Sequence, residues 1–196
     1  MILLKILKKS SLNKRSIDLM SIKNQRLLNI LMVVLPWLSL LFLGPRNIKR
    51  FLPVSILVVI LEGLHVQVGK KRRWWVFYNK PNSYLFNEFP FNLGPFLVIS
   101  LWILKLTYGN FKRFLLVNAV ANAFFAFPVA VLAKKIKYYS LVRLNHFQFF
   151  LYFFAKAPVL YGLQYLWEHR NKLSADTIKT NEKVLPFEQR SKKLSS

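Results

Sequence analysis

The sequence has no cysteine, and it is short of acidic residues, histidine and glycine, with 7 Asp+Glu, 3 His and 6 Gly in 196 residues. Without cysteine there is no disulfide, no Cys-ligated zinc, no iron–sulfur cluster and no thiol nucleophile. The scattered glycines form no Gly-x-Gly run, so the sequence contains no phosphate-binding loop or nucleotide fingerprint. No nucleophile–base set is recognisable either. We therefore predict no cofactor and lean towards a protein that is not an enzyme.

Cations and apolar residues are abundant. The chain is 54% hydrophobic and 16% aromatic, and its 30 Lys+Arg give a formal net charge of +23. A disordered basic tail would lack this apolar mass. A net charge of +23 would suit phosphate, but the cations punctuate the apolar runs instead of forming one face. We therefore expect no nucleic-acid partner.

The apolar residues form long uncharged blocks, each close to the roughly 20 residues that a membrane-spanning helix needs. The blocks are continuous, whereas a membrane β-barrel requires alternation. The sequence therefore predicts an all-α, polytopic membrane helical bundle of about five transmembrane helices within residues 27–167. The expected spans are 27–43, 51–69, 89–108, 114–133 and 147–167.

Two tails flank this bundle. Residues 1–26 are basic and could either lie flat on an anionic membrane surface or be solvated. Residues 168–196 are polar, and we predict that they are disordered. The chain shows no internal repeat of fixed period and no inverted pair of spans, which counts against a secondary transporter.

The distribution of cations favours a cytoplasmic N-terminus, because cytoplasmic flanks carry more Lys and Arg. The densest cluster follows the second run, where four cations precede two tryptophans. Indole rings and cations are favoured among lipid headgroups, so these six residues are predicted to be interfacial anchors. The anchors are Lys70, Lys71, Arg72, Arg73, Trp74 and Trp75. The bilayer with its anionic headgroups is the expected partner, and another membrane protein is a candidate partner.

Glu62 and His65 lie three residues apart in the second run, a spacing that places both on one helix face. Metal binding or proton relay would use such a pair. A di-metal bundle needs two such motifs and two more carboxylates, and only one motif is present. We therefore expect no metal, and a buried polar pair satisfied by neighbouring helices is the simpler interpretation.

Lys156 lies near the middle of the fifth run, where a charged side chain is costly. Glu62 is the only carboxylate inside another predicted span, at a similar depth, so we predict that the two side chains pair in the bundle interior. A water-filled cavity around Lys156 is the alternative. Asn118 and Asn122 lie one turn apart in the fourth run, where amides commonly join membrane helices and less often bind a substrate.

Residues 60–168 resemble a group of small multi-pass membrane proteins of Bacillus-type Gram-positive bacteria that have no assigned function. The resemblance implies a helical bundle in a bacterial plasma membrane and transfers no active site. The segments that carry it are RWWVFY (73–78), NEFPF (87–91), GPF (94–96) and LWILKLTYGNF (101–111).

Two functions are consistent with these features. The first is a non-enzymatic integral membrane protein that binds a partner or serves an envelope process. The second is a membrane-embedded lipid enzyme or small-solute carrier that uses Glu62, His65, Asn118, Asn122 and Lys156. A closed polar cavity would favour the second function, and a tightly packed interior would favour the first.

Overall fold

The structure, a computed structural model, describes residues 21–78 and 83–184 as a helical bundle with one small sheet. Four helical stretches are long and apolar enough to cross a membrane: Ile22–Phe42, Pro45–Lys71, Phe89–Thr107 and Phe111–Lys135. This confirms the all-α membrane bundle. The helices are α2 (Ile22–Ser39), η1 (Leu40–Phe42), α3 (Pro45–Lys71), α4 (Phe89–Phe91), η2 (Asn92–Phe96), α5 (Leu97–Thr107), α6 (Phe111–Phe124), η3 (Phe125–Val129), α7 (Ala130–Lys135), α8 (His146–Phe154) and α9 (Lys156–Val184).

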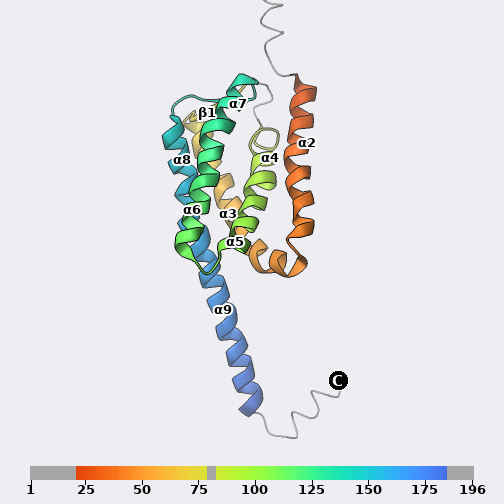
Figure 1. Cartoon of the computed structure of the whole chain (residues 1–196), viewed down its shortest axis with the longest axis vertical. Coiled ribbons are helices and arrows are strands. Elements are labelled where there is room, and N and C mark those ends of the chain that lie inside the picture. The colour runs from red at the N-terminus through yellow and green to blue at the C-terminus, as the bar shows by residue number, and fades with distance from the viewer. Residues whose placement is uncertain (1–20, 79–82, 185–196) are drawn as a thin grey trace, which may run out of the picture.

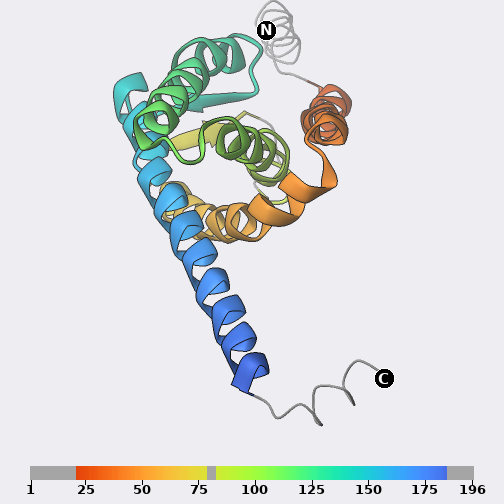
Figure 2. The ribbon, with the colours of Figure 1, turned by 60° about the horizontal axis from the view of Figure 1, so that its bottom comes forward.

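Successive helices run up and down the bundle, and α4, η2 and α5 form its central column (Figure 1, Figure 2). Around this column lie α2, α3, α6 and the α8–α9 pair. Half of the most apolar window of Phe89–Thr107 is buried, against 17% of the windows in Ile22–Phe42 and Phe111–Lys135. The third apolar run is therefore the core of the molecule, and the other helices pack around it.

Two prolines shape the interior by introducing π turns into the central column and into the fourth run. In η2 and in η3 the proline is the fourth residue of a five-residue π segment. A proline cannot donate a backbone hydrogen bond, and its ring clashes with the preceding turn, so the helix widens locally.

Each π turn leaves one carbonyl for a side chain of another helix. The Leu97 N–H donates to the carbonyls of Asn92 and Gly94 and so bypasses the carbonyl of Leu93. In the same way, the Ala130 N–H donates to the two carbonyls that flank that of Ala126. The Leu93 carbonyl instead accepts from Trp37 Nε1 at 2.8 Å. The Ala126 carbonyl accepts from His146 Nδ1 at 2.7 Å. The two widened turns are therefore bound to α2 and α8.

Several predicted boundaries differ from the observed ones. The first helix begins at Ile22, inside the expected tail, and the fifth run is two helices that break at Ala155. Pro158 explains the break, because it cannot donate to the Phe154 carbonyl. Helix α9 continues to Val184, so residues 168–184 are helical where disorder was predicted. Residues 1–20 and 185–196 lie outside the described part of the chain.

The stretch after α3, expected to be a loop at the membrane interface, contains the strand β1 (Trp75–Phe77). It pairs antiparallel with β2 (Tyr139–Leu141), so that Val76 faces Ser140. Each strand is only three residues long, too short for an alternating pattern that would predict it from the sequence.

The chain contains an internal repeat, although not one of fixed period. Three segments of the chain recur in the same order, and each recurrence lies in an equivalent structural element. NIKRFL recurs as NFKRFL at the start of a helix, GKKRRWWVF as AKKIKYYSL at its end, and NEFPFNL as NHFQFFL at the start of the next helix. The matching pairs are 47–52 with 110–115, 69–77 with 133–141, and 87–93 with 145–151. We call residues 47–107 the first repeat and residues 110–168 the second repeat.

The backbone confirms the equivalence of the two repeats. Arg73 and Lys137, at matching positions, both have positive φ, at 54° and 57°. The next N–H in each repeat bonds back to the matching carbonyl: Trp74 to Gly69 at 3.0 Å and Tyr138 to Ala133 at 2.9 Å. Both helices therefore end in the same left-handed turn before entering a strand.

Side-chain contacts between the repeats are also exchanged by this symmetry. The Trp75 and Phe149 rings lie 6.1 Å apart, and the matching pair, Tyr139 and Phe91, lies 5.9 Å apart. A two-fold operation that exchanges antiparallel strands has its axis perpendicular to them. Because α3 and α7 both run towards the sheet, this pseudo-two-fold axis follows the length of the bundle.

Candidate functional site

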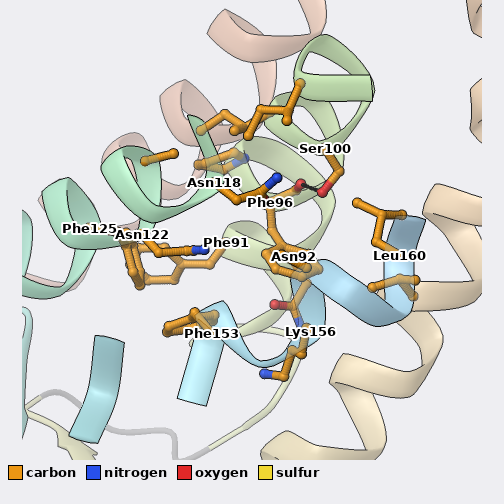
Figure 3. A pocket seen from close by; sticks show the side chains of 16 residues that line it. Phe91, Asn92, Phe96, Ser100, Asn118, Asn122, Phe125, Phe153, Lys156 and Leu160 are labelled. Carbon is orange, nitrogen blue, oxygen red and sulfur yellow. Dashed lines mark hydrogen bonds between the residues drawn. The ribbon is translucent and has the colours of Figure 1, made fainter. Parts of the chain in front are cut away.

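A cavity of about 90 Å³ lies between the two repeats, and each repeat supplies half of its wall (Figure 3). The first repeat contributes α3, α4, η2 and α5, and the second contributes α6, η3, α8 and α9. Most of the wall is aromatic and aliphatic. Its polar side chains, from four elements, are Asn92, Ser100, Asn118, Asn122 and Lys156. An apolar cavity with a few converging polar groups is the usual form of a small-molecule site.

The two asparagines of α6 both reach this cavity, as their spacing predicts. Asn118 donates from Nδ2 to the Phe114 carbonyl at 2.9 Å, which leaves its side-chain oxygen as an acceptor. Asn122 makes no side-chain hydrogen bond within residues 21–78 and 83–184. The cavity therefore offers an amide that can both donate and accept.

Lys156 and Glu62 form the predicted ion pair. The ammonium group of Lys156 is bound to the Glu62 carboxylate, and their side chains are only 15% and 1% exposed. The Tyr152 hydroxyl donates to Glu62 Oε1 at 3.1 Å. The Lys156 ammonium also lies 3.4 Å from the centre of the Tyr152 ring. The pair joins α3 of the first repeat to α9 of the second, and it leaves the wall of the cavity electrically neutral.

His65 does not join this site. Its side chain is exposed, whereas Glu62, three residues earlier, is buried. The three-residue spacing places two side chains about 60° apart around a helix. Because Glu62 lies at the edge of the buried face of α3, a rotation of this size places His65 on the exposed face. Of the five polar candidates, Asn118, Asn122 and Lys156 line the cavity, and Glu62 lies behind Lys156.

A second cavity, of about 40 Å³, lies beneath the two-stranded sheet. Most of its wall is aromatic, and Glu62 and Glu88 border it. It shares Phe91, Asn92, Phe125 and Phe153 with the larger cavity. Its volume is close to the roughly 30 Å³ that one water molecule occupies in the liquid. The interior between the repeats is therefore hollow in two adjoining places, separated by the Glu62–Lys156 pair.

The sheet end of the bundle is closed by buried polar contacts. Glu88 accepts from Trp75 Nε1 at 3.3 Å and lies 3.7 Å from the Lys70 ammonium. Burial raises the pKa of Glu88, and the nearby Lys70 charge opposes that shift. Trp75 was predicted to lie among lipid headgroups, but its ring is buried beneath these contacts. Trp74 is half-buried. Among the other predicted anchors, three cations are exposed: Lys71, Arg72 and Arg73.

The opposite end is closed by a side-chain cluster that the sequence analysis missed. Arg50 donates to both carboxylate oxygens of Glu168, at 2.6 and 2.9 Å, and Gln164 donates to Glu168 at 3.0 Å. These hydrogen bonds from Arg50 lower the pKa of Glu168. Beside them the Tyr108 and Tyr161 rings lie 5.4 Å apart. No local sequence signal connects Arg50 to Glu168. The recurrence of NxKRFL at 47–52 and 110–115 does, however, single out the start of α3, where Arg50 lies, as a repeated structural element.

Comparison with known proteins gives no relative: no protein family, curated protein or solved structure matches the chain. The function is therefore inferred from the cavity, its neutral lining and the contacts at the two ends of the bundle.

Proposed function

We propose that the protein is a multi-pass protein of the bacterial plasma membrane that binds a small uncharged molecule in the 90 Å³ cavity between its repeats. The observation that carries the proposal is the set of three asparagine amides, Asn92, Asn118 and Asn122, in a mostly apolar wall. This arrangement matches the carrier function more closely than a solidly packed scaffold. Because the described residues present no nucleophile–base set at the cavity, we propose binding without chemical conversion.

The chemistry of the lining supports an uncharged ligand. Among the described residues that line the larger cavity, Lys156 is the only ionisable side chain, and Glu62 already neutralises it. An anion would have to displace Glu62, and a cation would meet the ammonium group with no carboxylate to balance it. The volume corresponds to about three water molecules, at roughly 30 Å³ each. The ligand therefore has few heavy atoms, with an apolar part and a group that hydrogen-bonds an amide.

In the proposed membrane arrangement, α8 and the part of α9 up to Trp167 together make a fifth crossing. Broken helices are tolerated in bilayers where the freed backbone is buried by protein. The N-terminus and the sheet end then face the cytoplasm. There the exposed cations Lys71, Arg72 and Arg73 meet anionic headgroups.

Thermal unfolding of the detergent-purified protein tests this function with three probes of one carbon skeleton: propionamide, propionate and propylamine. Propionamide is expected to raise Tm, and the two ions are not. Ala121→Phe, which fills the cavity, should abolish the effect, whereas Val120→Phe on the exposed face of the same helix should retain it. Equal shifts with all three probes, or an undiminished shift in Ala121→Phe, would contradict the proposal.

A second candidate function follows from α9, which leaves the bundle and extends beyond it (Figure 1). A membrane-protein partner on that side could recognise the projecting helix. A photo-crosslinking residue at exposed Leu173 should then give one discrete crosslinked species, and the same residue at exposed Leu116 should not. Identical patterns at both positions would count against a partner at α9.

A further inference from the structure

Contacts that join one repeat to the other are found at both ends of the bundle. At the sheet end, β1 of the first repeat pairs with β2 of the second. At the opposite end, Arg50 of the first repeat holds Glu168 of the second. The two repeats are thus two bodies that meet along the bundle axis, with the cavity between these two sets of contacts.

The symmetry of the repeats gives these two bodies a natural axis of movement. The pseudo-two-fold axis follows the length of the bundle, so both repeats have the same orientation across the membrane. Parallel repeats related by an axis along the membrane normal occur in transporters, where the substrate site lies at the interface of the repeats. Three matching pairs of side chains line the cavity on both sides: Val58 with Ala121, Pro95 with Phe153, and Ile99 with Ala157.

We propose that the protein is a carrier, in which the two repeats rock against each other and expose the cavity alternately at the sheet end and at the Arg50–Glu168 end. This inference rests on the proposed binding function and adds transport to it. The Glu62–Lys156 pair crosses the interface between the ends and serves as the pivot. Because this pair stays closed, the path is neutral and admits an uncharged solute.

The two ends differ in how easily they open. The sheet end combines backbone hydrogen bonds with the buried rings of Trp75, Tyr139 and Phe149. The other end also has a ring contact, between Tyr108 and Tyr161, but its polar contact between the repeats is an ion pair whose arginine side chain is 48% exposed. In the described part of the chain, no backbone hydrogen bonds pair strands there. Exposed ion pairs contribute little stability, whereas buried aromatic contacts contribute more. The resting protein is therefore expected to open first on the side where α9 emerges.

The absence of cysteine makes this movement directly measurable. Ser100→Cys places one thiol in the cavity wall, and Val76→Cys with Ser140→Cys places two thiols at facing strand positions. Facing strand residues have Cα atoms about 4.5–5.5 Å apart, which a disulfide can span. A membrane-impermeant maleimide, added to one side of sealed vesicles, then reports which end is open.

Without the strand disulfide, the thiol at position 100 should be labelled from either side. With the disulfide formed, labelling from the sheet side should fall at least tenfold, and labelling from the α9 side should rise. The rise is the decisive result, because locking one end of a carrier shifts its population to the other open state. Val76→Cys without its partner is the matched control and should show neither change after oxidation.

Three outcomes would overturn the carrier. An unchanged α9-side rate in the locked protein would indicate a channel, and labelling from one side only would indicate a one-sided binding pocket. No labelling from either side would indicate a sealed cavity. The Tm measurements with propionamide distinguish these results from a failure of binding. If propionamide raises Tm, Ala121→Phe abolishes the rise, and labelling occurs from one side only, then the protein binds a small molecule but does not transport it.

Discussion

At the scale of single residues, the interior is organised by one buried ion pair. The pairing of Glu62 with Lys156 could be predicted because both residues stand alone in their apolar runs at similar depth. The hydrogen bond from the Tyr152 hydroxyl to the Glu62 carboxylate could not be predicted. Tyr152 is one of many aromatic residues in its run, and nothing in its spacing distinguishes it from a residue that faces lipid.

The first prediction concerns this pair. Glu62→Gln or Lys156→Met alone leaves an unpaired buried charge and should cost about 3–5 kcal/mol of stability. The double change removes both charges, so its loss should be clearly smaller than the sum of the single losses. Unfolding of the purified variants measures this. Arg50→Gln, which breaks the partly exposed pair at the other end, should cost about 1 kcal/mol or less. Strict additivity in the double variant would show that the two charges do not depend on each other.

The second prediction is a dependence on pH that originates at Glu88. Because burial raises its pKa in the folded state above the ordinary 4.5, the folded protein holds this proton more tightly than the unfolded chain. The contribution of Glu88 to stability should therefore be greatest below pH 4.5 and should fall as the pH rises through the folded-state pKa. Glu88→Gln should remove that fall in a series of Tm measurements.

Glu168 provides the opposite control, because its pKa is lowered in the folded state by the hydrogen bonds from Arg50. Its contribution is present at neutral pH and is lost as the pH falls through the folded-state value. Glu168→Gln should therefore flatten the acidic side of the Tm profile and leave the decline due to Glu88 in place. If both variants changed the same side of the profile, the assigned directions would be wrong.

At the scale of elements, the apolar runs located the four candidate membrane spans, because uncharged blocks of this length have few other uses. The finer features escaped for identifiable reasons. The strands are hidden in aromatic segments that read equally well as interfacial anchors. The repeats are not separated by a fixed period. The π turn of η3 adds one residue to the second repeat, and the connection after β1 is longer than the one after β2.

The third prediction tests the two π turns. His146→Phe removes the donor to the Ala126 carbonyl, and Trp37→Phe removes the donor to the Leu93 carbonyl. An unsatisfied carbonyl that is shielded from water, by protein or by the proposed bilayer, costs about 1–3 kcal/mol, so each variant should be destabilised by that order. Trp167→Phe, at an exposed tryptophan, should be nearly neutral. Equal losses in Trp37→Phe and Trp167→Phe would mean that loss of indole area, not the hydrogen bond, explains the effect.

At the scale of the whole molecule, the duplication explains why the interior is hollow. Each repeat presents a matching helix to the axis, but their side chains have diverged: Phe125 stands where the first repeat has Glu62. Because a charged residue in one repeat corresponds to an aromatic residue in the other, the two halves cannot pack by simple symmetry. The cavities lie beside this mismatch, and the Glu62–Lys156 pair occupies its centre.

The last prediction tests the equivalence of the repeats as structural units. Phe51 and Phe114 occupy matching positions in NIKRFL and NFKRFL, and both are almost fully buried. Each packs on a tyrosine at the same end of the bundle, with ring centres 5.8 Å apart for Phe51 and Tyr108 and 4.9 Å apart for Phe114 and Tyr161. Replacing either phenylalanine with alanine should therefore cost about 3–5 kcal/mol, since both leave a cavity of similar shape. Phe42→Ala, at a ring that is 79% exposed, should cost far less in the same unfolding measurement. A large loss for one buried phenylalanine and tolerance at the other would show that the two repeats, although alike in backbone, no longer bear equal shares of the fold.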